Sequence, residues 1–458
     1  MEDKDKMKLE DNNVLIFGTG LSGISAANLL QNVNCKIILF DTNTELNVQE
    51  LKLKLSPEFN GEIVLGDLSE ELLSRIDIAV LSPGVPTDLE LVNKIREKNI
   101  TIIGEIELAY YFSNGKIAAI TGTNGKTTTT TLVGEIMKTY FENVFVVGNI
   151  GIPYTKVALE TTKESVIVAE MSSFQLETIA DFRPDVSAIL NITPDHLNRH
   201  HTMENYIAAK FNIAKNQRPE DICVLNYEDN VLREFGKTLK CRVIYFSSQH
   251  NLSKGIYLED ENIIYSTGNN KELICNIHEL NIFGRHSYEN VMAAVAMSIS
   301  LNVPLEYIKK AVTAFEAVEH RIEFVTTKNG VKYYNDSKGT NPDASMKAIE
   351  SMEVPTYLIA GGYDKGSEFD EWIEAFNGKI KGLVLIGQTR EKIAETARNH
   401  GFEAIIMADD LETAVKTCYE LAGSGECVLL SPACASWGSF KNYEERGHLF
   451  KEYVKQLG

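Results

Sequence analysis

The sequence predicts an α/β protein in three blocks, each built on a parallel sheet. Short apolar runs are followed by glycine-rich or polar turns and then by helical patterns, and this alternation is typical of βαβ units. The chain has 458 residues, which is more than one hydrophobic core usually holds. We place the boundaries near Gly104 and Ala317, so the predicted domains cover residues 1–104, 105–317 and 318–458.

The predicted strands are the apolar runs, and each ends in a polar turn. In the first block they cover residues 14–17, 36–40 and 78–81. In the second block they cover residues 117–121, 144–147, 166–169 and 186–190. In the third block they cover residues 331–334, 357–360, 383–386 and 428–430. Open parallel sheets bind ligands beyond the carboxyl ends of their strands, so the residues that follow these runs are the candidates for a site.

Composition and charge exclude several classes of protein. Apolar residues make up 44% of the chain and charged residues 24%, which is typical of a soluble globular protein. A net charge of −19 argues against a nucleic-acid partner. The seven cysteines are scattered, which indicates reduced thiols and no disulfide framework. The charged start is no secretory signal and no apolar run approaches the roughly 20 residues that span a bilayer, so we expect a cytoplasmic protein without membrane attachment.

A glycine turn follows the first predicted strand. Residues 18–23 read GTGLSG and open a helical pattern over 24–30, and Asp41 follows the next strand. Such a turn lets the backbone approach phosphates at the start of a helix. From the residues alone, a dinucleotide such as NAD is the leading interpretation. Another nucleotide, or plain packing of strand on helix, remains open.

A second glycine loop follows the strand over 117–121. Residues 121–128 read TGTNGKTT, which departs from the common phosphate-loop spacing because that spacing would place glycine at Ile120. The loop still combines two glycines with a lysine and a hydroxyl at the start of a helix. Its backbone amides are expected to hold phosphates, while Lys126 reaches the β- and γ-phosphates and the Thr127 hydroxyl holds Mg²⁺.

Two neighbouring strands of the same block end in groups that suit a metal. Glu170 directly follows an apolar strand, where a carboxylate without a partner is costly. Asp195 and His196 follow the next strand. Each alone could be a helix-start acid or a structural histidine. Together with the phosphate loop at the same edge, they predict a metal–nucleotide site.

The turns of the third block carry hydroxyls and lysines. They follow three predicted strands, over residues 335–341, 361–365 and 431–443. This composition suits a small anionic molecule, although each turn alone could be an ordinary capped turn. Two further residues have ordinary interpretations by pattern. Lys210 is typical of a solvated helix lysine. Asn290 is either a helix cap or a residue that hydrogen-bonds a nucleobase.

Several motifs occur in one order along nearly the whole chain: GTNGKTTT, EMSSFQLE, NITPDHLNRH, GRHSYEN, EHRIE, NDSKGTN and SPACASWGSF. Together they resemble the Mur ligase family, and Asn124 with residues 172–176 resembles its D-glutamate-adding branch. The resemblance implies a Rossmann-like N-terminal domain, a central P-loop ATPase-type domain and a Rossmann-like C-terminal domain. It also implies that the first glycine turn serves a UDP-linked substrate and not NAD.

The resemblance implies a role for individual residues. The UDP-substrate residues would be Leu21, Ser22, Asp41, Thr42, Gly84 and Asn149. The ATP-binding residues would be Gly122, Thr123, Asn124, Gly125, Lys126, Thr127, Thr128, Asn290, Arg321 and Asp336. The D-glutamate-binding residues would be Thr340, Lys365, Ser436 and Tyr443, and family relatives can carry Phe where Tyr443 stands.

The resemblance also implies the metal and catalytic groups. Two Mg²⁺ ions would be organised by Thr127, Glu170, His196 and a carbamylated Lys210. A lysine ammonium would repel the cation, whereas its carbamate is an anionic oxygen ligand. The catalytic residues would be Lys126, His196, Lys210 and Asp195.

The implied reaction joins D-glutamate to UDP-N-acetylmuramoyl-L-alanine at the expense of ATP, through an acyl phosphate, in peptidoglycan biosynthesis. We expect these small-molecule partners, no nucleic acid, no membrane and a monomer. Three alternatives remain: an NAD-dependent oxidoreductase, a non-catalytic nucleotide-binding protein, and a folylpolyglutamate synthetase-like ligase. The first leaves the phosphate loop unexplained, and the second needs no amino-acid site.

Overall fold

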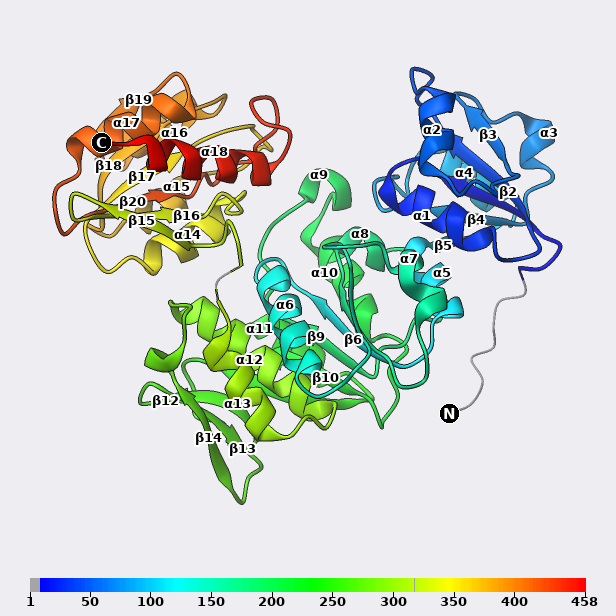
Figure 1. Ribbon diagram of the computed structural model, residues 1–458, viewed down its shortest axis with the longest axis horizontal. Helices are drawn as coiled ribbons and strands as arrows, with labels where there is room; N and C mark the ends of the chain where they lie inside the picture. The colour runs from blue at the N-terminus through cyan, green and yellow to red at the C-terminus, as the bar shows by residue number, and fades with distance from the viewer. Residues whose placement is uncertain (1–8, 317) are drawn as a thin grey trace. The chain divides into compact units, whose positions relative to one another are not determined.

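The computed structural model describes residues 9–316 and 318–458, in which helices and strands are organised around three sheets (Figure 1). These residues pack as two compact units. One unit runs to Asn276 and includes Glu289–Thr313; the other combines Ile277–Tyr288 with Ala314–Gly458. Ala317 lies outside the described residues, and the predicted domain boundaries stay predictions.

The first sheet is parallel throughout, with strand order β3-β2-β1-β4-β5. Its strands are β1 (Asn13–Phe17), β2 (Lys36–Asp41), β3 (Glu62–Leu65), β4 (Ile78–Leu81) and β5 (Thr101–Gly104). The accompanying helices are α1 (Leu21–Leu30), α2 (Val48–Lys54), α3 (Glu70–Leu73) and α4 (Glu90–Glu97). The order reverses at β1, which lies between β2 and β4. A parallel sheet opens a crevice at such a point, and here the first glycine turn borders it.

The central sheet has the order β14-β13-β12-β11-β10-β9-β6-β8-β7 in the described residues. Its strands are β6 (Lys116–Thr121), β7 (Val144–Gly148), β8 (Val166–Glu170), β9 (Val186–Ile189), β10 (Ile222–Asn226), β11 (Arg242–Ser247), β12 (Gly255–Glu259), β13 (Asn262–Ser266) and β14 (Lys271–Asn276). The predicted parallel sheet is confirmed from β7 to β12. However, β13 and β14 extend it with antiparallel pairs. The central sheet is therefore mixed.

The helices of the central region follow the same alternation. They are α5 (Glu105–Phe112), α6 (Lys126–Lys138), α7 (Tyr154–Val157), η1 (Ala158–Glu160), α8 (Ser173–Leu176), α9 (Leu197–His200), α10 (Met203–Phe211), η2 (Asn212–Ala214), α11 (Asn230–Gly236), η3 (Ile277–Glu279), α12 (Arg285–Ser300) and α13 (Leu305–Ala314). Because β6 lies between β8 and β9, the turns after these three strands share one edge. In the part of the chain that the structure describes, no helix is long and apolar enough to cross a membrane.

The third sheet has the order β15-β16-β20-β17-β18-β19 in residues 318–458. Its strands are β15 (Glu323–Lys328), β16 (Val331–Asn335), β17 (Thr356–Ala360), β18 (Ile380–Leu385), β19 (Ile405–Met407) and β20 (Cys427–Leu430). Its helices are α14 (Pro342–Glu350), α15 (Asp370–Glu374), α16 (Arg390–Asn399), α17 (Leu411–Leu421) and α18 (Tyr443–Gln456). One apolar core holds residues of α14, α15 and α16, and a second holds residues of α17 and α18. Helices therefore cover both faces of this sheet, whose edge pair β15–β16 is antiparallel.

The first sheet and the central sheet share one core within their unit, where α1 packs against α7. Polar groups reinforce this packing. The buried Glu105 carboxylate accepts hydrogen bonds from the Thr155 backbone and hydroxyl at 2.7 and 2.8 Å, and the Thr155 hydroxyl also donates to Ser25 at 2.9 Å. Buried polar groups need such partners, so this contact favours one arrangement of the two sheets.

Candidate active site

The second glycine loop joins β6 to α6 in a conformation that requires its glycines. Gly122 has φ 153° and Gly125 has φ 84°, values that side chains rarely tolerate. A Cβ atom at Gly125 would lie 2.2 Å from Asn290 Oδ1. The sequence pattern left Asn290 open between a helix cap and a nucleobase contact, and the resemblance assigned it to ATP. The structure brings Asn290 directly against the loop.

Asn191 holds this loop from the neighbouring strand end, a role that the sequence did not indicate. Its side-chain oxygen accepts a hydrogen bond from Asn124 N at 2.8 Å, and its side-chain nitrogen donates to Asn124 O at 3.1 Å. Its backbone oxygen accepts from Thr123 N at 3.0 Å. The only signal available in the sequence was its position directly after the strand over 186–190.

Two lysines converge on one carbonyl of the loop. Lys126 Nζ donates to Gly122 O at 2.9 Å and to Thr123 O at 2.8 Å. Lys210 Nζ, from α10, donates to the same Gly122 O at 2.7 Å. Burial, and then the charge of Lys126, hold the pKa of Lys210 well below its ordinary value. Lys210 is therefore a buried amine and not the solvated helix lysine that its pattern suggested.

Glu170 ends β8 beside these lysines and is buried. Its Oε1 accepts a hydrogen bond from Asn149 Nδ2 at 2.8 Å, whereas its buried Oε2 has no partner among the described residues. An acid oxygen without a donor is costly in a protein interior, and a cation relieves that cost. Thr127, the second residue of α6, adds a hydroxyl, and this donor set fits a hard cation such as Mg²⁺.

Asp195 and His196 lie in the turn that follows β9. His196 Nε2 is 3.6 Å from Asp195 Oδ2. The His196 ring packs edge-on against the Phe174 ring, with 4.9 Å between the ring centroids. His196 has φ 54°, an uncommon conformation for a residue with a side chain. Asp195 and Glu170 also act electrostatically on Lys210. The structure thus gathers Lys126, Glu170, Asp195 and Lys210 at one edge of the central sheet.

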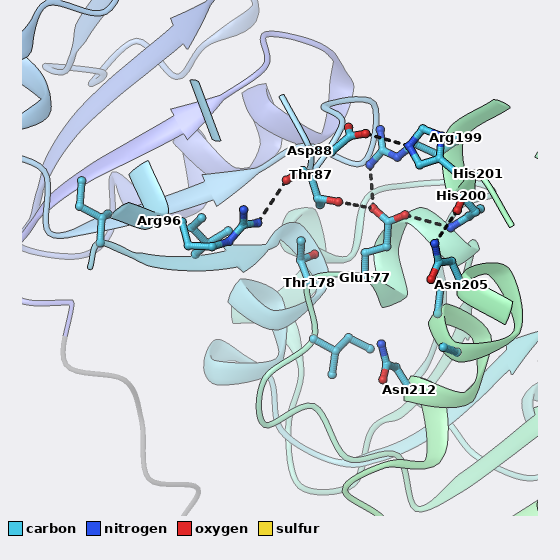
Figure 2. A pocket seen from close by; sticks show the side chains of 15 residues that line it. Thr87, Asp88, Arg96, Glu177, Thr178, Arg199, His200, His201, Asn205 and Asn212 are labelled. Atoms are coloured by element: carbon cyan, nitrogen blue, oxygen red, sulfur yellow. Dashed lines mark hydrogen bonds and ion pairs between the residues drawn. The ribbon is translucent and has the colours of Figure 1, made fainter. Parts of the chain in front are cut away.

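Glu177 links the segment after His196 to the first sheet. Figure 2 shows its carboxylate between three donors, with Thr87 at 3.2 Å, Arg199 at 2.8 Å and His200 at 3.2 Å. These residues border a cavity of about 640 Å³. Because Arg199 and His200 belong to α9, which begins directly after His196, this network fixes the turn that carries His196. No sequence motif pointed to this network of Glu177.

A separate cavity of about 530 Å³ lies at the carboxyl edge of the first sheet. It is lined by all six residues that the resemblance assigns to the UDP-linked substrate: Leu21, Ser22, Asp41, Thr42, Gly84 and Asn149. Asn149 also bonds Glu170, so this cavity adjoins the metal-type cluster. Gln175 also lines this cavity, although the sequence indicated no separate role for this residue.

The Asp41 carboxylate at the end of β2 is engaged by donors of the turns after β1 and β2. Its Oδ2 accepts from the Thr19 backbone at 3.0 Å and hydroxyl at 2.8 Å, and its Oδ1 accepts from Asn43 N at 3.0 Å. Burial alone would raise the pKa of Asp41, but these hydrogen bonds hold it below its usual value. The carboxylate therefore shapes the cavity wall. A dinucleotide site would need this carboxylate to accept hydrogen bonds from a ribose, and its engagement by the protein does not favour that interpretation.

The C-terminal sheet brings its strand-end loops together. The Ser337 hydroxyl donates to Tyr443 O at 2.8 Å, and Tyr363 N donates to Ala435 O at 2.9 Å. The three loops are those that follow β16, β17 and β20. They carry the residues predicted to hold D-glutamate: Thr340, Lys365, Ser436 and Tyr443.

Arg321 and Asp336 form a pair in the same unit. Arg321 Nη1 lies 3.5 Å from Asp336 Oδ1, and the Ser431 hydroxyl donates to Asp336 Oδ2 at 2.7 Å. Burial raises the pKa of Asp336 to about 6, although Arg321 opposes that shift. Asp336 is fully buried, so in this conformation it holds Arg321 in place and offers no surface to a nucleotide.

Three domain models of one family match the chain in order. The MurD-like N-terminal domain of Mur ligases matches residues 12–104, the Mur ligase middle domain residues 120–298, and the Mur ligase glutamate ligase domain residues 320–434. These matches cover most of the chain and show that it belongs to the Mur ligase family.

Its relatives are UDP-N-acetylmuramoylalanine--D-glutamate ligases. The one from Lachnoclostridium phytofermentans is 61% identical over 97% of this chain and 98% of its own length. The one from Lachnospira eligens is 54% identical over 98% of this chain and its full length. Among solved structures, MurF from Acinetobacter baumannii is similar with a TM-score of 0.62 and 15% identity over 97% of this chain and 93% of that chain. At that identity the likeness shows the fold alone.

Proposed function

We propose that this protein joins D-glutamate to UDP-N-acetylmuramoyl-L-alanine with hydrolysis of ATP, a step of peptidoglycan synthesis. The observation that carries the proposal is the 61% identity, over nearly the whole chain, with a UDP-N-acetylmuramoylalanine--D-glutamate ligase. The geometry supports it independently, because a phosphate loop, a buried acid cluster and a nucleotide-sized cavity adjoin one another in one unit. Its substrates are water-soluble, and we propose a cytoplasmic monomer.

The reaction needs an activated carboxyl group, because a carboxylate is a poor electrophile. An oxygen of the L-alanine carboxylate attacks the γ-phosphorus of ATP, ADP leaves, and an acyl phosphate forms. The amine of D-glutamate then attacks the acyl carbon, and the tetrahedral intermediate expels phosphate to leave an amide. We assign Asp195 to accept the proton that the amine loses, with the metal ligand His196 3.6 Å from it.

The phosphate loop binds ATP in this proposal. Gly122, Thr123, Asn124, Gly125, Thr127 and Thr128 offer backbone and hydroxyl donors, and Asn290 supports the loop. Lys126 exchanges its carbonyl partners for the β- and γ-phosphates and offsets the charge of two approaching anions. Thr127, Glu170, His196 and carbamylated Lys210 would hold Mg²⁺, two ions in this proposal, and the metal would neutralise phosphate charge. We assign Arg321, held by Asp336, to the nucleotide.

Lys210 is proposed to carry a carbamate. Carbon dioxide adds only to a neutral amine, and the lowered pKa of Lys210 makes that form accessible. The amine nitrogen bonds to the carbon of CO₂ and one proton leaves, so the cation becomes an anion. The reversal would supply an anionic oxygen ligand at a position that interacts electrostatically with Glu170, whose Oε2 has no partner among the described residues.

The two organic substrates bind to different units of the chain in the proposal. Leu21, Ser22, Asp41, Thr42 and Gly84 surround the UDP portion, and Asn149 meets the part nearest the reacting carboxyl group. In the C-terminal unit, Thr340, Lys365, Ser436 and Tyr443 hold D-glutamate. Hydroxyls and a lysine match its two carboxylates.

The test is phosphate release from ATP and Mg²⁺ with UDP-N-acetylmuramoyl-L-alanine, compared for D-glutamate, L-glutamate and no amino acid. We expect release only with D-glutamate, together with the mass gain of one glutamyl residue in the precursor. Release with a different amino acid would keep the ligase chemistry and change the substrate. Release that needs no amino acid would favour a nucleotide-hydrolysing or regulatory protein.

A further inference from the structure

Arg446 is a buried cation at the meeting point of the C-terminal loops. It lies in the first turns of α18 and is among the largest fully buried side chains of the chain. In the part of the chain that the structure describes, no carboxylate forms an ion pair with it. A buried charge is expensive without polar partners, so its contacts indicate what it is for.

Its partners are oxygens of two different loops. Arg446 Nε donates to the Ser337 hydroxyl at 3.0 Å, and Nη2 donates to Ser337 O at 2.8 Å. Nη1 donates to Cys434 O at 3.2 Å. One planar guanidinium thus ties the loop after β16 to the loop after β20. Lysine cannot reproduce this, because an ammonium presents its donors from a single point.

The loop after β17 closes the same arrangement. A Cβ atom on Gly362 would lie 3.4 Å from Arg446 Nη1, so this loop abuts the guanidinium. The Ser337 hydroxyl, which accepts from Arg446, also donates to Tyr443 O at 2.8 Å. Arg446 therefore contacts, directly or through one hydroxyl, every loop that carries a residue proposed to hold D-glutamate.

We infer that Arg446 is the positioning residue of the amino-acid subsite: it sets the spacing of the Ser337 and Cys434 loops and supplies positive charge beneath them. The inference rests on the proposed amino-acid-binding role of those loops. Although burial lowers the pKa of Arg446 to about 10, the group stays charged at neutral pH. The buried Asp336 carboxylate offsets part of this charge, but it also pairs with Arg321, so one carboxylate serves two guanidinium groups. The positive charge that remains acts on an anionic substrate, whose two carboxylates need such compensation.

Two substitutions separate geometry from charge. Arg446→Lys keeps the charge and loses the planar fork, so we expect KM for D-glutamate to rise about tenfold with little change in KM for ATP. Arg446→Met has a similar length and loses both, so we expect a rise of about a hundredfold. Arg398→Lys, at an exposed position of α16, is the matched control and should change neither constant.

A purely structural role predicts a different result. In that case both Arg446 variants lower the melting temperature, while KM for D-glutamate at 20 °C stays within twofold of the parent, and the inference is wrong. If neither variant folds, Ser337→Ala takes their place, because it removes the hydroxyl that joins Arg446 to Tyr443. KM for D-glutamate should rise severalfold in Ser337→Ala, and an unchanged value contradicts the inference.

The parent enzyme separates this inference from the proposed function. If the parent uses another amino acid, the proposed substrate is wrong, and the KM series is then measured with the amino acid that supports turnover. A selective rise of that KM upholds the role of Arg446. Equal rises in the constants for amino acid, ATP and nucleotide precursor overturn it.

Discussion

The two glycine turns of the first unit look alike in sequence and differ in structure. Both follow a buried parallel strand and open a helix, α1 in one case and α6 in the other. The turn after β1 is completed by the Asp41 carboxylate, which accepts hydrogen bonds from Thr19. The loop after β6 is completed by Lys126 and Lys210, which share Gly122 O. A carboxylate thus bonds the first turn, whereas two amines bond the second loop.

The difference teaches that glycine spacing specifies a backbone shape and not a ligand. Glycines permit positive φ values and close approach in both places. The electrostatic partners that select the ligand come from other elements: Asp41 from β2, and Lys210 from α10. Substitutions of these partners and glycines should therefore affect the two loops in different ways.

The largest expected effect is that of Lys126→Ala in the second loop. Removal of the cation that is proposed to meet the β- and γ-phosphates should lower phosphate release by about a thousandfold. The measurement is the steady-state release of phosphate with all substrates saturating. Lys138→Ala, on the exposed side of the same helix, is the control and should keep parent activity. Turnover near the parent rate in Lys126→Ala would remove this loop from the ATP site.

Lys210→Ala should be nearly as damaging, for a different reason. It removes the proposed carbamate, and the loss of one metal ligand should reduce activity by about a hundredfold. Added acetate or formate should restore part of the activity, because a small carboxylate can occupy the vacated space. The same additions to Lys126→Ala serve as the control and should restore nothing. No loss in Lys210→Ala contradicts any role in the site.

The fold was largely predictable because the strands that carry the site are buried runs with clear ends. β4 begins and ends where predicted, and β6 to β9 differ from prediction by a residue or so. The edge strands β3, β5 and β14, and β13 beside β14, were not individually predicted. β3 and β14 are partly exposed and mix polar with apolar residues, and a short mixed run of this kind resembles a loop.

The site was less predictable, because its geometry depends on contacts between distant residues. Lys210 has the sequence pattern of a surface lysine, and only packing of α10 against the second loop buries it. Arg446 and Asn191 act through their hydrogen bonds to loops that lie far away in sequence. No local periodicity encodes such pairings. The residues that motif resemblance supplied, such as Asn290, could not have been chosen from spacing alone.

Gly125→Ala should have a smaller effect than either lysine substitution. Its φ of 84° costs an alanine about 1–2 kcal/mol, and the new methyl group would collide with Asn290 Oδ1. We expect a lower melting temperature and a rise in KM for ATP of about tenfold. Thermal unfolding and ATP titration of the same preparation measure both quantities. An unchanged melting temperature would show that the loop adopts another conformation in solution.

Gly20→Ala in the first turn should have the smallest effect, and it tests the comparison most sharply. Gly20 has φ −68°, and a Cβ atom there would meet no atom within 4 Å, so the folded state should not be strained. The methyl group would instead enter the cavity that Gly20 lines. We therefore expect an unchanged melting temperature, an unchanged KM for ATP, and a KM for the UDP-linked precursor raised by about threefold. A change in the ATP constant would mean that the two glycine turns do not serve separate ligands.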